Sequence, residues 1–162
     1  MRQTDQNWPS IQAKLLLACM AGDLNTIKSL IASGVDINTR IASDSGATLL
    51  TDSILYNQKE LAIWLIENGA DVNLPLPNGR TPLMTVAATD EIGLARKLIE
   101  AGADVNKQAN NGATALMYAV HYNKLPLAKL LIECGARRNL RDKDGWTFET
   151  YALLNGVDIS RL

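Results

Sequence analysis

The segment Asn78-Gly79-Arg80-Thr81-Pro82-Leu83 opens a unit that recurs along the chain. Its glycine belongs to a series with a constant spacing of 33 residues: Gly46, Gly79, Gly112 and Gly145. Threonines keep the same interval two residues further on, at Thr48, Thr81, Thr114 and Thr147. A period of this length is too short for a propeller blade and too long for most leucine-rich repeats. It predicts a repeat protein whose unit is two short helices and a turn.

Each residue of this opening segment has a mechanical role in the predicted unit. Asn78-Gly79 is a tight-turn dipeptide that can reverse the chain at the tip of a short hairpin. Thr81 can cap the first helix, and Pro82 suits the first helical position, where its missing N–H is not needed. We expect this helix to run to about Thr89. The second helix should end before Gly102, which takes the left-handed conformation of a C-terminal cap.

The second helices are too short to be stable alone. The segment Leu94-Ala95-Arg96-Lys97-Leu98-Ile99 is mostly apolar but has charged residues on one side. A helix of this length gains its stability from tertiary packing. Each unit must therefore bury its apolar surface against the next one, which gives a one-dimensional stack.

These motifs resemble the ankyrin repeat. The resemblance rests on Gly79-Arg80-Thr81-Pro82-Leu83 and on Gly-Ala-Asp-Val-Asn at 69–73 and 102–106, and it extends from about residue 10 to the end. It implies an all-α ankyrin repeat solenoid of stacked helix-turn-helix units with short hairpin fingers, capped at both ends. We expect one domain over residues 1–162. Its divisions are an N-terminal capping unit at 1–43, repeats at 44–76, 77–109 and 110–142, and a truncated C-terminal capping unit at 143–162.

The chain departs from the family pattern at three places. Met84 and Met117 stand where ankyrin repeats have histidine, so we expect thioether packing in place of a threonine–histidine hydrogen bond. The segment from Thr39 to Ser45 holds two extra residues, which should lengthen the first finger. At the N-terminus we expect a helix over residues 14–21, with Asn7 or Ser10 as its cap and Trp8 as a lid over the end of the stack.

Composition excludes several classes of function. The formal net charge of the 162 residues is −1, and the basic cluster at 137–143 is balanced by Asp142 and Asp144, so we expect no binding to nucleic acid or to a membrane surface. The start of the chain lacks the apolar core of a signal peptide, which favours a cytoplasmic protein. Cys19 and Cys134 fit neither a disulfide framework nor a metal-ligand spacing. We expect a monomer.

No catalytic, cofactor-binding or metal-binding residues are assigned. His121 is the only histidine. No serine or cysteine lies where His121 could act as its base, so we expect no enzyme. The recurring pairs of the loops could be read as metal ligands: Asp36 with Asn38, Asp71 with Asn73, and Asp104 with Asn106. We interpret them instead as polar side chains that tie neighbouring loop backbones together.

The resemblance implies that partner proteins bind the concave face, which is the surface made by the finger tips and the exposed side of the first helices. Aromatic residues on a rigid surface are the anchors that protein interfaces use most. The chain would then be an adaptor or scaffold, or an inhibitor of a partner enzyme such as a toxin-neutralising immunity protein. The alternative is an enzyme or a small-ligand-binding protein with its site around His121. The candidate protein-binding residues are Asp44, Tyr56, Asn78, Arg80, Asn111, Tyr118, His121, Tyr122, Lys143 and Trp146.

Overall fold

The computed structural model describes residues 7–41, 46–89, 91–160 and 162. The described residues form α-helices with one isolated antiparallel bridge, between Arg40 and Thr48. The helices are α1 (Trp8–Ala21), α2 (Leu24–Ala32), α3 (Leu49–Leu55), α4 (Lys59–Glu67), α5 (Pro82–Val86), α6 (Ile92–Glu100), α7 (Ala115–His121), α8 (Leu125–Glu133) and α9 (Phe148–Leu154).

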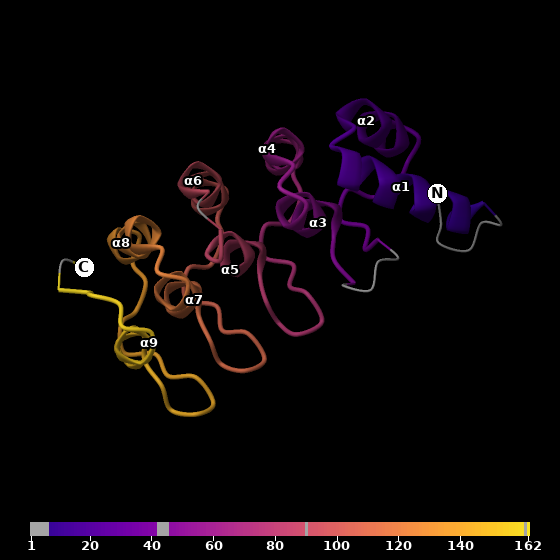
Figure 1. Cartoon of the computed structure of the whole chain (residues 1–162). Coiled ribbons are helices and arrows are strands. Elements are labelled where there is room, and N and C mark those ends of the chain that lie inside the picture. The colour runs from indigo at the N-terminus through magenta and orange to yellow at the C-terminus, as the bar shows by residue number, and fades with distance from the viewer. Residues whose placement is uncertain (1–6, 42–45, 90, 161) are drawn as a thin grey trace.

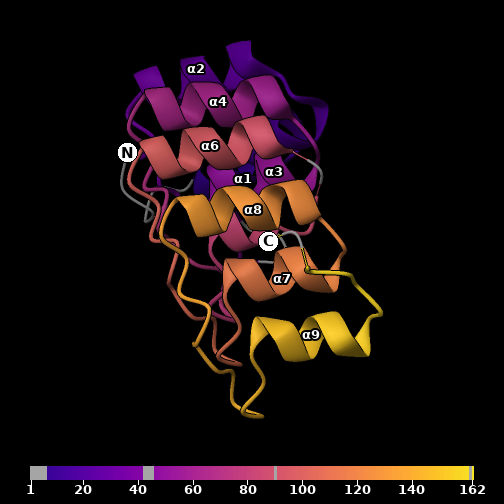
Figure 2. The same cartoon turned by 90° about the vertical axis from the view of Figure 1, so that its left-hand side faces the viewer.

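The helices lie in two rows. Figure 1 looks along most of them and shows α2, α4, α6 and α8 in one row and α1, α3, α5, α7 and α9 in the other. The loops before α5, α7 and α9 project from the second row, as hairpin fingers do (Figure 1). Turned by 90°, the helices of the first row lie side by side in chain order (Figure 2). The all-α repeat solenoid expected from the 33-residue period is therefore confirmed.

The threonine caps form as expected, and the methionines do more than pack. The N–H of Met84 donates to Thr81 Oγ1 at 3.3 Å, and the N–H of Thr81 donates back to the sulfur of Met84 at 3.5 Å. Likewise, the N–H of Met117 donates to Thr114 Oγ1 at 3.3 Å, and the N–H of Thr114 donates to the sulfur of Met117 at 3.4 Å. The thioether thus accepts the hydrogen bond that closes a capping box, a role that glutamate or glutamine usually has.

Two helix boundaries differ from the sequence prediction. The first helix begins at Trp8 rather than at Lys14, with Pro9 in its first turn and Ser10 inside it. Asn7 is its N-cap but makes no side-chain cap hydrogen bond, and Trp8 packs half-buried against the core. The first helix of the unit that begins at Gly79 ends at Val86 rather than near Thr89, whose hydroxyl donates to the Val86 carbonyl at 2.9 Å. A side chain that bonds its own backbone competes with helix continuation.

Asparagines connect the loops of successive helix pairs. The side chain of Asn73 accepts from the N–H of Asp104 at 2.8 Å and donates to the carbonyl of Gly102 at 3.0 Å. The side chain of Asn106 likewise accepts from the N–H of Arg137 at 2.7 Å and donates to the carbonyl of Gly135 at 3.1 Å. The prediction that these polar residues tie neighbouring loops together is confirmed for the asparagines. The aspartates act within their own loops, since each accepts the N–H of the asparagine two residues later.

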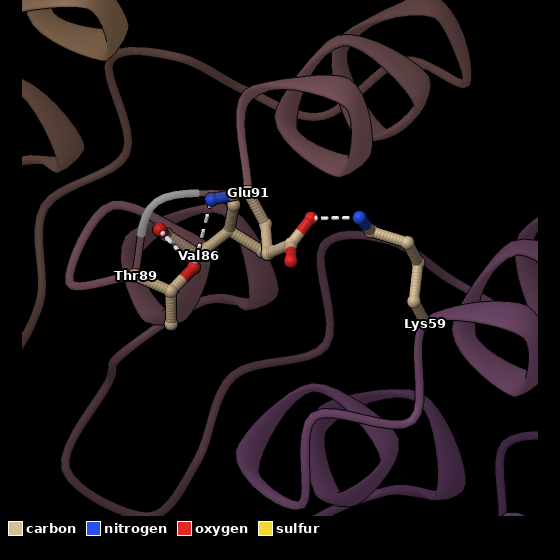
Figure 3. A network of polar contacts seen from close by, with 4 residues as sticks. All are labelled: Lys59, Val86, Thr89 and Glu91. Atoms are coloured by element: carbon tan, nitrogen blue, oxygen red, sulfur yellow. Dashed lines mark hydrogen bonds and ion pairs between the residues drawn. The ribbon is translucent and has the colours of Figure 1, made fainter.

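An ion pair also joins two neighbouring pairs of helices. Lys59, the first residue of α4, pairs with Glu91, the N-cap of α6 (Figure 3). The hydrogen bond and charge of Glu91 raise the pKa of Lys59 above its ordinary value. The N–H of Glu91 donates to the hydroxyl of Thr89 at 3.4 Å. Lys59 is exposed and Glu91 is half-buried, so the pair contributes less to the stack than the buried contacts do.

The extra length of the first finger lies mostly outside the described residues, because positions 42–45 are not among them. Cys19 is buried in the core and Cys134 is exposed. None of the helices described is long and apolar enough to cross a membrane.

Candidate protein-binding face

The structure places most of the candidate residues at the surface. Arg80 and Tyr118 are half-buried, and Asp44 lies outside the described residues. The exposed ones are Tyr56, Asn78, Asn111, His121, Tyr122, Lys143 and Trp146.

The candidates do not form one continuous site. The candidates Asn111, Tyr118, His121 and Tyr122 line a hollow of about 220 Å³, whereas Arg80, Lys143 and Trp146 are not among its lining residues. Tyr56, the C-cap of α3, and Asn78, at the second finger, do not line this hollow. The residues that line it are Asn111, Ala113, Met117, Tyr118, His121, Tyr122 and Tyr151. We call it the α7–α9 hollow.

Four rings form a chain of edge-to-face contacts beside the hollow. The ring centroid of His121 lies 4.8 Å from that of Tyr122 and 5.9 Å from that of Tyr151. The Tyr151 ring is in turn 5.7 Å from the ring of Trp146, and all three pairs are close to perpendicular. Edge-to-face packing at these distances is favourable for aromatic side chains. The rings are therefore held in place before any partner arrives.

Asp142 anchors this ring cluster, and sequence reasoning missed that role. Its carboxylate accepts the hydroxyl of Tyr151 at 2.7 Å and the backbone N–H groups of Trp146 and Asp144 at 2.8 and 3.0 Å. The residue is 8% exposed. Burial, followed by the hydrogen bond to Asp142, raises the pKa of Tyr151 above its ordinary value. The one indication of this role in the sequence was that Asp142 stands at the repeat position that Ala109 occupies in the preceding finger.

The inward position of Asp142 changes how the surface charge is distributed. The sequence suggested that it balances the basic cluster, and the structure shows that its oxygens are directed to protein donors. Two of the cations are also used internally. Arg138 lies 5.9 Å from the ring centroid of Phe148, and Arg141 donates to the carbonyl of Gly145 at 2.7 Å.

The tautomer of His121 is fixed by Asn155. The amide nitrogen of Asn155 donates to the carbonyl of Tyr151 at 2.7 Å, and a carbonyl can only accept, so the amide orientation is settled. The same nitrogen lies 3.3 Å from Nδ1 of His121. Nδ1 must then accept, which leaves the proton of the neutral ring on Nε2. His121 is consequently an oriented hydrogen-bond donor.

Arg80 lies against the Tyr118 wall of the hollow. Its guanidinium carbon is 4.7 Å from the ring centroid of Tyr118, a cation–π distance. One terminal nitrogen donates to the carbonyl of Met84 at 3.4 Å, which is a long hydrogen bond. The Nε atom is buried and has no acceptor among the described residues.

Nothing in this arrangement resembles a nucleophile with its base. The recorded neighbours of His121 are Tyr122, Tyr151 and Asn155, none of which is an activated nucleophile. Burial, and then the charge of Asp52, raises the pKa of the Cys19 thiol to about 12, which suppresses the reactive thiolate. No group of three potential metal ligands occurs in the part of the chain that the structure describes.

The fold and this surface define an ankyrin-type repeat protein, and comparison with known proteins agrees. The family model for ankyrin repeats (three copies) matches residues 15–109 and 85–162. The chain therefore belongs to the ankyrin repeat family, whose members are generally protein–protein interaction modules and typically not enzymes.

Two curated relatives match over part of the chain. It is 34% identical over 87 residues to the ankyrin repeat protein YahD of Escherichia coli (strain K12). The matched stretch covers 54% of this chain and 42% of YahD. It is 42% identical over 60 residues to the palmitoyltransferase akr1 of Schizosaccharomyces pombe, which covers 36% of this chain and 9% of that enzyme. The chain thus spans less than half the length of either relative.

Proposed function

We propose that this chain is a protein-binding module and that its concave face, centred on the α7–α9 hollow, takes a partner protein. One observation carries the proposal: Tyr122 and Trp146 are 44% and 40% exposed and form the two ends of the chain of four rings in contact. Large amphipathic rings that are already ordered lose little conformational entropy on binding, and such residues dominate interface energetics.

The opposite side of the stack offers less for a partner. The helices α4, α6 and α8 present mixed charges such as Lys129 and Glu133, both exposed, and Lys97 is paired with Glu67 at 3.2 Å. Lys and Glu are depleted at interface cores. These residues provide matched controls for the aromatic variants.

The proposal is tested with paired baits. Affinity purification with mass spectrometry uses the unmodified chain, a Tyr122→Ala/Trp146→Ala double variant and a Lys129→Ala/Glu133→Ala double variant. We expect at least one protein to be retained by the unmodified chain and the control but lost by the aromatic variant. With that partner purified, each aromatic substitution alone should cost about 2 kcal/mol, a factor of about thirty in affinity.

Other outcomes would contradict the proposal. If the partner binds the aromatic variants normally and loses affinity for the Lys129→Ala/Glu133→Ala variant, the site lies on α8. Thermal melts must accompany the binding data, because a ring that supports the fold would lower the melting temperature as well as the affinity.

The partner's own activity then separates two versions of this function. An adaptor leaves the partner's catalytic rate unchanged. An inhibitor, including one of the toxin-neutralising type, lowers that rate in proportion to the complex formed. The measurement is a titration of the partner's activity with this chain and with the aromatic double variant.

A further inference from the structure

We propose that the α7–α9 hollow receives a carboxylate from the partner, the side chain of an aspartate or glutamate in an acidic segment. This inference rests on the proposed function and specifies the chemistry of the partner. It follows from four properties of the hollow: the hydrogen bonds of its lining residues, its lack of a free carboxylate, its neighbouring charge, and the helix end beside it.

Two polar groups that line the hollow, Asn111 and His121, offer donors while their side-chain acceptor atoms are engaged. The hydroxyls of Tyr118 and Tyr122 can donate as well as accept, and that of Tyr151 already donates to Asp142. The side-chain oxygen of Asn111 accepts the N–H of Ala113 at 3.1 Å, which leaves its NH₂ group free to donate. His121 holds its proton on Nε2 because Asn155 occupies Nδ1. A ligand that brings acceptors can therefore use the donors of Asn111 and His121 together.

No carboxylate lines the hollow to satisfy these donors. The nearest candidate is Asp142, which bonds the hydroxyl of Tyr151 behind the ring, and its oxygens accept three protein donors. An acidic side chain from a partner would therefore meet no competing carboxylate among the lining residues.

Arg80 is not itself a lining residue of the hollow, but it places a positive charge without a counterion against the Tyr118 ring that lines it. Its guanidinium stacks on Tyr118, yet it makes no ion pair with any described residue and its Nε has no acceptor there. A half-buried charge is screened less by salt than a fully exposed one. The backbone of Lys143 is tied to the lining residue Asn111, because its N–H donates to the Asn111 carbonyl at 2.9 Å.

The same facts argue against a cationic ligand, which an aromatic-lined hollow could otherwise attract. The Tyr118 ring already has Arg80 against it, so a second cation there would meet a like charge. A helix C-terminus favours cations through its free carbonyls. At the end of α7, however, Tyr122, Asn123 and Lys124 donate their N–H groups to the carbonyls of Tyr118, Val120 and Ala119.

The experiment uses a random linear peptide library displayed against the immobilised full chain. We expect the enriched peptides to share an aspartate or glutamate at a fixed position. For the best peptide, replacing this residue by its amide should weaken binding at least tenfold. On an Arg80→Gln variant, the acid and amide forms of the peptide should differ by less than threefold.

Two further variants complete the design. Arg96→Gln makes the same change of net charge on exposed α6 and should bind the acidic peptide within twofold of the unmodified chain. His121→Phe keeps a ring but removes the Nε2 donor, and it should weaken the acidic peptide at least threefold while the melting temperature stays within 2 °C or so. His121 is exposed, so this variant tests the inference even if Arg80→Gln does not fold.

Enrichment of peptides that share a basic or purely apolar anchor, or of none with a shared acid, would overturn the inference. An acidic peptide that binds Arg80→Gln and Arg96→Gln equally well would overturn it too. None of these results contradicts the proposed function, provided that Tyr122→Ala and Trp146→Ala still weaken binding of the protein partner by a factor of about thirty each. Loss of that aromatic dependence would instead refute the proposed function itself.

Discussion

The asparagine connections between loops predict a graded series of stability losses. Asn73 and Asn106 each make two side-chain hydrogen bonds to the next loop, whereas Asn38 makes one, to the N–H of Asp71 at 2.8 Å. Asn139 occupies the same repeat position and makes none to the residues described after it. Substitution by alanine therefore removes two of these bonds at Asn73 and at Asn106, one at Asn38 and none at Asn139.

The expected magnitudes follow from the bond count. A protein hydrogen bond contributes about 1 kcal/mol net, and these groups are exposed, so the freed partners regain water and no burial penalty is added. Asn73→Ala and Asn106→Ala should each lower the free energy of unfolding by about 2 kcal/mol, and Asn38→Ala by about 1 kcal/mol. Asn139→Ala should change it by a few tenths of a kcal/mol at most.

Urea unfolding followed by circular dichroism at the helix band measures the series. With a urea dependence of about 2–3 kcal/mol per molar for a chain of this size, the two-bond variants should shift the midpoint by about 0.7–1 M. Equal losses at all four positions would refute the reasoning, because they would mean that the asparagine acts within its own loop. A loss at Asn139 as large as that at Asn106 would refute it as well.

Three other perturbations have defined outcomes. A Cβ on Gly112 would meet the backbone of Asp142 at 2.7 Å, whereas one on Gly145 meets nothing within 4 Å, so thermal melts should show Gly112→Ala to be the more destabilising although both have positive φ. Thiol labelling at pH 8 should modify Cys134 quickly and Cys19 only after denaturation; equal rates would contradict the burial. The raised pKa of Cys19 should lower stability as the pH rises from about 9, where the unfolded thiol ionises, towards about 12, and a Cys19→Ala variant should lose part of this dependence. Tyr151→Phe leaves a buried carboxylate oxygen without its donor and should cost about 1–3 kcal/mol by chemical denaturation.

The fold was predictable because the repeat shows each structural signal several times. The caps at Thr81 and Thr114 and the left-handed residues between helices follow from local chemistry, and Asn57 and Asn123 do adopt positive φ values of 58° and 55°. Such features depend on neighbours within a few residues, so a single sequence contains them.

The candidate site was predictable only as a set of exposed positions. That Asp142 turns inward depends on Tyr151, nine residues later and in the next helix, and on a side-chain orientation that no local pattern specifies. In the sequence it stands among Arg141 and Lys143 and looks like part of a solvated charged loop. The contact between Arg80 and Tyr118 likewise joins residues 38 positions apart through the stacking of successive units.

The repeat also explains why the ring cluster lies at one end of the face. One position of the first helices holds Asp52, Thr85, Tyr118 and Tyr151 in successive units at intervals of 33 residues. Asp52 and Thr85 are buried, whereas the tyrosines are half-buried and line the α7–α9 hollow. Residues that keep the period are required for capping and stacking in every unit, so a specific partner can be recognised only by residues that vary from unit to unit. The change from small polar residues to tyrosine at this position is such a variation, and it coincides with the hollow, the oriented His121 donor and the unpaired charge of Arg80.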